Sequence, residues 1–191
     1  MFKNLTMLAG AAGGVAMAVA VGAPSPSQLL AQLTGQKQPG AHCQVNWGTG
    51  DQSAGQSAGP HTGRVSDLRA GAHRCYDRIV IDLGPGQKPG YQVRYVAEVD
   101  SQGSGNPVPL RGRAQLLVQV DANARPSFPA SSSELVNVSG FSVVRQVAGA
   151  GSFEGQTDLG IGVKGKRPFR VRVLSGPGQD SRLVIDVARH R

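Results

Sequence analysis

Hydrophobic and polar residues alternate in short runs along most of the chain after residue 63. Such runs, rich in Val, Ile and Leu and separated by Gly and Pro, are typical of β-strands with one buried face. They predict strands at residues 64–70, 76–83, 91–99, 110–120, 141–148, 156–164, 169–174 and 182–187. No segment of ten or more residues in this part of the chain has helical periodicity. The pattern therefore predicts an all-β sandwich or barrel.

Two of these runs are near copies of each other. Residues 78–83 and 182–187 have Arg, Val, Ile and Asp at the same positions. Because side chains alternate along a strand, Arg78 and Asp82 share one face and the larger hydrophobic residues share the other. The copies either arose by chance or are equivalent strands of a pseudo-symmetric β-sandwich. Their Arg and Asp side chains either pair across strands or, through Arg78 and Arg182, contribute to an anion-binding face.

The N-terminal region has a different composition. Residues 1–23 fit a secretory signal peptide, because Lys3 precedes an uncharged stretch of Leu, Ala, Gly and Val that ends in small residues. An uncleaved anchor is the alternative, although the apolar run is short for a membrane span. Residues 24–41 are rich in Pro, Ser, Gln and Gly and predict a flexible linker. The folded domain is then expected at residues 42–191, secreted or associated with the cell envelope, with no membrane span once the signal peptide is cleaved.

Charge and cysteine content narrow the choice of partners. The formal net charge is +8, and cleavage after residue 23 would remove one basic residue and no acidic one. Export separates a protein from nucleic acid, so the charge favours envelope polymers or anionic lipid head groups, with simple solubility as the alternative. Cys43 and Cys75 are the only cysteines, which in an exported protein predicts a disulfide. This bridge would clip an N-terminal extension onto the domain, with Trp47 either packed against it or exposed as a sugar-stacking platform.

Signatures of catalysis are absent from the sequence. There is no Gly-rich phosphate loop, no metal-ligand spacing and no recognisable nucleophile motif. We therefore expect no enzymatic activity, no cofactor and no metal site. Residues 73–78 and 151–157 are dense in polar groups, and they either shape a groove for a saccharide or peptide or serve turn chemistry. The predicted ligand-binding residues are Tyr76, Asp77, Arg78, Arg94, Glu154 and Gln156.

Linked motifs extend these observations. In chain order they are Cys43 with Trp47-Gly48, residues 65–83, residues 89–96, residues 151–157 and residues 168–187. Together they resemble the AMIN-like domain of secreted actinobacterial proteins over residues 42–189. The wider AMIN family is a two-fold-symmetric β-sandwich attached to periplasmic N-acetylmuramoyl-L-alanine amidases and to secretin-type pilus proteins, which it targets to the cell wall.

The resemblance implies a non-catalytic envelope module that binds peptidoglycan or another wall polymer. One alternative is a protein-interaction module that recruits or regulates a wall enzyme. Another is a hydrolase with an unrecognised site. The sequence leaves the oligomeric state open.

Overall fold

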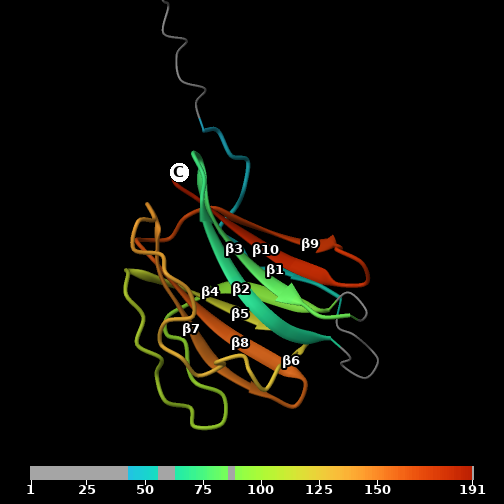
Figure 1. Ribbon diagram of the computed structural model, residues 1–191. Coiled ribbons are helices and arrows are strands. Elements are labelled where there is room, and N and C mark those ends of the chain that lie inside the picture. Colours follow the sequence, from blue (N-terminus) through green and yellow to red (C-terminus); the bar gives the residue numbers. More distant parts are fainter. Residues whose placement is uncertain (1–42, 56–62, 86–88, 191) are drawn as a thin grey trace, which may run out of the picture. The chain divides into compact units, whose positions relative to one another are not determined.

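The described part of the chain folds into two five-stranded sheets (Figure 1). In the computed structural model this part comprises residues 43–55, 63–85 and 89–190, so the predicted signal peptide and linker lie outside it. Its strands are β1 (Gln52–Ala54), β2 (Arg64–Ala72), β3 (Tyr76–Leu83), β4 (Tyr91–Val96), β5 (Ala114–Val120), β6 (Asn123–Ala124), β7 (Val144–Phe153), β8 (Gln156–Val163), β9 (Phe169–Ser175) and β10 (Ser181–Ala188). Sheet A has the order β1-β4-β5-β8-β7, and sheet B has the order β6-β2-β3-β10-β9. The predicted all-β sandwich is thus confirmed.

All eight predicted strands are present, with some different ends. Strand β4 stops at Val96 and β5 starts at Ala114, because the intervening residues 97–113 leave the sheet. Strand β7 starts three residues later than predicted and continues to Phe153. The two unpredicted strands, β1 and β6, have only three and two residues, too few to show an alternating pattern.

The hydrophobic core lies between the two sheets. The inward faces of the central strands supply Ile79, Ile81, Leu116, Val118, Leu159, Ile161, Leu183 and Ile185, each at most 1% exposed. Burying a side chain of this size contributes about 1.5–3 kcal/mol. The alternation seen in the sequence therefore fixes which face of each central strand points inward.

The two near-identical strands lie side by side in the centre of sheet B. Strands β3 and β10 are antiparallel, and Val80 pairs with Val184, its counterpart in the other copy. A local two-fold axis therefore passes between these two residues. Arg78 lies opposite Asp186, and Arg182 lies opposite Asp82. This register confirms that the copies occupy equivalent positions in the sheet.

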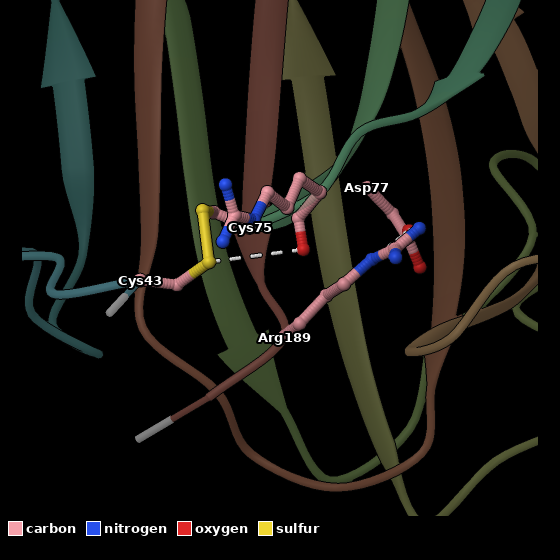
Figure 2. Close-up of a disulfide and its surroundings, with 5 residues drawn as sticks. Cys43, Cys75, Asp77 and Arg189 are labelled. Atoms are coloured by element: carbon pink, nitrogen blue, oxygen red, sulfur yellow. Dashed lines mark hydrogen bonds and ion pairs between the residues drawn. A yellow bond between two sulfur atoms is a disulfide. The ribbon is translucent and has the colours of Figure 1, made fainter. Parts of the chain in front are cut away.

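The N-terminal extension, which runs from Cys43 to β1, is held to the domain by a disulfide and by aromatic packing. Cys43 and Cys75 form the predicted disulfide, with their Cα atoms 5.2 Å apart (Figure 2). Trp47 is partly buried and packs against the domain, where its ring lies 5.8 Å from the ring of Tyr76 and 4.2 Å from the Arg170 guanidinium. The structure therefore agrees with the predicted packing of Trp47 rather than with a fully exposed platform.

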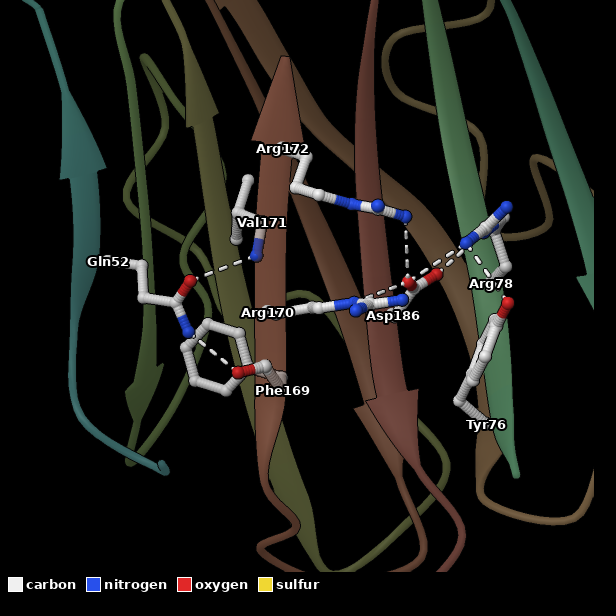
Figure 3. Close-up of polar contacts among 8 residues, drawn as sticks. All are labelled: Gln52, Tyr76, Arg78, Phe169, Arg170, Val171, Arg172 and Asp186. Atoms are coloured by element: carbon white, nitrogen blue, oxygen red, sulfur yellow. Dashed lines mark hydrogen bonds and ion pairs between the residues drawn. The ribbon is translucent and has the colours of Figure 1, made fainter. Parts of the chain in front are cut away.

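The extension also covers the outer edge of β9. The amide of Phe169 donates to the carbonyl of Gly48. The side chain of Gln52 donates to the carbonyl of Phe169 and accepts from the amide of Val171, at 2.7 and 2.9 Å (Figure 3). One glutamine thus takes the hydrogen-bonding place of a neighbouring strand, which protects an edge that would otherwise be open to other chains.

Residues 97–113 cover one part of the outer face of sheet A. Val99, Leu117 and Ala150 form a small second hydrophobic cluster beneath this segment. The segment lies so close to β8 that only glycine fits at position 160. A Cβ atom at Gly160 would lie 2.7 Å from a methyl group of Leu110. On the rest of this outer face, Gln92, Gln119 and Gln156 stay at least partly exposed in the described part of the chain. Within the described residues, no helix is long and apolar enough to cross a membrane.

Candidate functional site

The six predicted ligand-binding residues separate into three places. Arg94 and Gln156 lie on the outer face of sheet A with Glu154 at the adjoining turn, Tyr76 and Arg78 lie on sheet B, and Asp77 lies inside the sandwich. The sequence therefore identified parts of two separate surfaces rather than one site.

Asp77 is fully buried at the start of β3. Its carboxylate accepts hydrogen bonds from the backbone amides of Val143 and Val144, at 2.7 and 3.1 Å. The guanidinium of Arg189 donates to the other carboxylate oxygen from 2.9 Å (Figure 2). These contacts tie β3 to the start of β7 and the end of β10, so Asp77 has an internal role. Its position two residues before Ile79 already indicates an inward side chain.

The uncovered part of sheet A carries a row of polar side chains across three adjacent strands. We call this set the polar row: Gln92 and Arg94 from β4, Gln119 from β5, and Gln156 and Asp158 from β8. The register places Gln92 opposite Gln119 and Gln119 opposite Asp158. Both Asp158 oxygens accept amide hydrogen bonds, one from Gln156 at 2.7 Å and one from Gln119 at 3.1 Å. The carboxylate therefore orients two glutamines.

Two shallow hollows flank the polar row. The first, of about 290 Å³, is lined by Gln92, Gln119 and Gln156 together with Asp121 and the end of β1. The second, of about 550 Å³, is lined by Arg94 and Asp158 on its sheet side. Strands β4, β5 and β8 line the first hollow with Gln92, Gln119 and Gln156. The same strands line the second hollow with the residues two positions away, Arg94, Leu117 and Asp158. The two hollows therefore adjoin each other. Together they provide an extended polar depression rather than an enclosed pocket.

An exposed aromatic ring lies beside Gln156, at the tip of the β7–β8 hairpin. Phe153 is 63% exposed and is the one large hydrophobic side chain found exposed in the described residues. It pairs with Gln156 across the β7–β8 hairpin, and directly paired residues of antiparallel strands point to the same face. Glu154, in the same hairpin turn, is exposed and has a positive φ of 49°. Phe153 is not among the predicted ligand-binding residues, although it lies within the polar segment 151–157.

A cluster of basic side chains lies on the outer face of sheet B. The guanidiniums of Arg78, Arg170 and Arg172 all contact the carboxylate of Asp186, at 2.6, 2.9 and 3.4 Å (Figure 3). Asp186 is fully buried beneath them, whereas the arginines are 23–42% exposed. We call these four residues the arginine cluster. The expected pairing of Arg and Asp across strands is therefore confirmed for Arg78 and Asp186.

The arginine cluster holds Asp186 ionised. Burial acts to raise the pKa of Asp186, but the hydrogen bonds from Arg78 and Arg170 outweigh it and keep the pKa below its ordinary value. The same hydrogen bond, acting against burial, raises the pKa of Arg78. Arg78 therefore remains charged, and the one carboxylate that the three arginines share offsets only part of the positive charge around it.

Comparison with known proteins adds one finding. A model of the AMIN-like domain family matches residues 63–189, which is most of the described part of the chain. No curated protein and no solved structure matches the chain. Within the described ranges, no group of three or more His, Cys, Asp or Glu side chains is arranged to hold a metal ion.

Proposed function

Because the chain belongs to the AMIN-like domain family, we propose that it is an exported, non-catalytic module that binds peptidoglycan or another cell-wall polymer. Membership of this family indicates a cell-wall-associated protein outside the cytoplasm. The choice of polymer, and of the surface that binds it, rests on the side chains described above.

The observation that carries the proposal is the polar row beside Phe153. Sugars and short peptides offer hydroxyl, amide and carboxylate groups, and the glutamine amides can both donate to them and accept from them. Asp158 already fixes the rotamers of Gln119 and Gln156, which lowers the entropy lost when a ligand binds. Arg94 adds a cation for the carboxylates of wall peptides, and Phe153 adds an aromatic face for the apolar side of a sugar ring.

The shape of the surface also favours a polymer. The two hollows adjoin across three strands and are open to solvent, so an extended chain can lie across them. A small ligand is usually bound in a cavity that surrounds most of its surface. An open polar depression is better suited to several successive units of a glycan strand.

Sedimentation with purified cell-wall sacculi tests the proposal. We expect enrichment of the protein in the pellet at moderate salt, where nonspecific attraction of a basic protein to polyanions is weakened. Phe153→Ala and Gln156→Ala should each reduce the bound fraction about tenfold, because each removes about 1–2 kcal/mol of contact. Gln179→Ala, which changes an exposed glutamine in the β9–β10 turn, is the matched control and should bind as the wild type does. Equal pelleting with all variants, or no pelleting, would contradict the proposal.

A protein-interaction module is a second candidate, favoured by one edge of sheet B. Strand β6 pairs with β2 only at Arg64 and Val65, and within the described residues no strand pairs with the rest of that edge of β2. An extended segment of a wall enzyme could add to this edge as a further strand. Co-purification of a defined partner after wall polymer has been removed would support this candidate.

A hydrolase is the third candidate, favoured by the second hollow. Glu98 and Asp100 line it together with Asp158, and paired carboxylates are the usual machinery of glycoside hydrolysis. Against this, both oxygens of Asp158 are occupied by glutamine amides. Release of soluble fragments from sacculi by the wild type but not by Asp100→Asn would establish this activity.

A further inference from the structure

We propose that the arginine cluster is a second binding site, which takes the phosphate groups of an anionic envelope polymer. It lies on sheet B, on the opposite side of the sandwich from the polar row. The proposal relies on the envelope location of the proposed function but not on its glycan surface.

The arginine cluster carries more positive charge than its one carboxylate can neutralise. Arg78, Arg170 and Arg172 bring three positive charges to the single carboxylate of Asp186, which leaves a local charge of +2. One arginine would be enough to neutralise a buried aspartate. Arg170 and Arg172 lie two residues apart on the same face of β9, so their charges repel each other and a bound anion would relieve this repulsion.

The guanidiniums of the arginine cluster have more N–H donors than their contacts within the described residues use. Each guanidinium has five N–H donors. Among the described residues, Arg78 makes three side-chain hydrogen bonds, two to Asp186 and one to the Tyr76 hydroxyl. Arg170 and Arg172 make one each, both to Asp186. Most of the donors in the cluster are therefore available, and guanidiniums bind phosphate oxygens in a bidentate way.

Aromatic rings beside the arginine cluster hold two of its arginines in place. The Arg170 guanidinium lies over the Trp47 ring, and the Arg78 guanidinium lies over the Tyr76 ring at 5.0 Å from its centre. Cation–π contacts and the shared carboxylate hold these side chains in place (Figure 3). Less conformational entropy is then lost when an anion binds.

The surroundings of the cluster favour a polymer over a membrane surface. Proteins that dock on membranes usually insert exposed apolar side chains beside their basic residues. The one exposed large hydrophobic side chain of the described residues, Phe153, belongs to sheet A. The two rings beside the arginine cluster, Trp47 and Tyr76, are each partly buried and lie under arginine side chains. Among the described residues, this face therefore offers guanidiniums to phosphates but no exposed large hydrophobic side chain to insert into lipid.

The chain contains a direct reporter for the test, because Trp47 is its only tryptophan and contacts the cluster. Soluble poly(glycerol phosphate) is titrated into the full-length protein at about 0.1 M salt, and Trp47 fluorescence is followed. We expect saturable binding that Arg172→Gln weakens about tenfold. Arg172→Lys should give an intermediate affinity, since it keeps the charge and loses the planar fork. Lys164→Gln removes the same charge from an exposed position on another part of the surface and should change the affinity less than twofold.

Three results would overturn the proposal. Equal weakening by Lys164→Gln and Arg172→Gln would show that net charge alone attracts the polymer. The absence of saturable binding would show that there is no site. Tighter binding to phosphatidylglycerol vesicles than to the polymer at equal phosphate concentration would show that the face docks on membranes. The sacculus variants Phe153→Ala and Gln156→Ala should leave this titration unchanged, so failure of one proposal can be told from failure of the other.

Discussion

Replacement of Asp77 by alanine should strongly destabilise the domain without removing a ligand contact. The carboxylate is fully buried and accepts from the amides of Val143 and Val144. Alanine leaves both buried N–H groups without a partner, at about 1–3 kcal/mol each. Arg189 is 21% exposed and can turn toward water, so its loss adds little. We expect the free energy of unfolding to fall by about 3–5 kcal/mol in total, which corresponds to a Tm lower by roughly 10 °C.

Two further variants make this prediction specific. Asp77→Asn can keep an oxygen toward the two amides and lose only the contact with Arg189, so we expect a cost of about 1 kcal/mol. Asp82→Ala is the matched control, because Asp82 pairs with a single arginine that is 54% exposed, and its cost should stay below about 1 kcal/mol. Urea unfolding followed by circular dichroism measures all three. The reasoning is refuted if Asp77→Ala and Asp82→Ala have the same stability.

Three other predictions concern the extension, the arginine cluster and the edge of β9. Replacing both Cys43 and Cys75 by serine should lower the free energy of unfolding by roughly 3–4 kcal/mol. Trp47 emission should shift to the red because the extension detaches, and unchanged emission would contradict this. Because the folded pKa of Asp186 is lowered, its contribution to stability is complete above the unfolded pKa of about 3.9 and is lost as pH falls below it. Unfolding free energies measured between pH 7 and pH 3 should therefore decline more steeply for the wild type than for Asp186→Asn. Gln52→Ala should lower the free energy of unfolding by about 1–2 kcal/mol. Because it opens the edge of β9, it should also increase self-association, measured by size-exclusion chromatography. An unchanged elution profile would count against a protective role of Gln52 at this edge.

The sequence predicts the sandwich well because its strands are short hydrophobic runs separated by Gly and Pro, and the alternation is complete in β3. Ile79 and Ile81 point inward and Arg78 points outward, as the period of two requires. The equivalence of β3 and β10 could also be predicted, since both copies keep the same residues in register. That the copies pair directly with each other could not be predicted, because pairing depends on how the intervening chain is routed between the sheets.

The candidate site was predicted less completely. Gln156 and Arg94 were selected from local polarity, but Gln92 and Gln119 join them only through the pairing of β4, β5 and β8, which links residues far apart in the sequence. The surplus of arginine around Asp186 likewise requires the register of β3, β10 and β9. Pattern alone suggested simple pairs of Arg and Asp and gave no reason to expect three arginines on one carboxylate.

The central claim is that the polar row binds wall polymer, and side-chain amide signals test it most directly. Solubilised peptidoglycan fragments are titrated into ¹⁵N-labelled protein, and the amide groups of Gln92, Gln119 and Gln156 are followed by NMR. We expect these signals and the backbone signal of Phe153 to shift together and saturate, while the Gln179 signal does not shift. Shifts confined to other surfaces, or no saturable shift at the three glutamines, would contradict it.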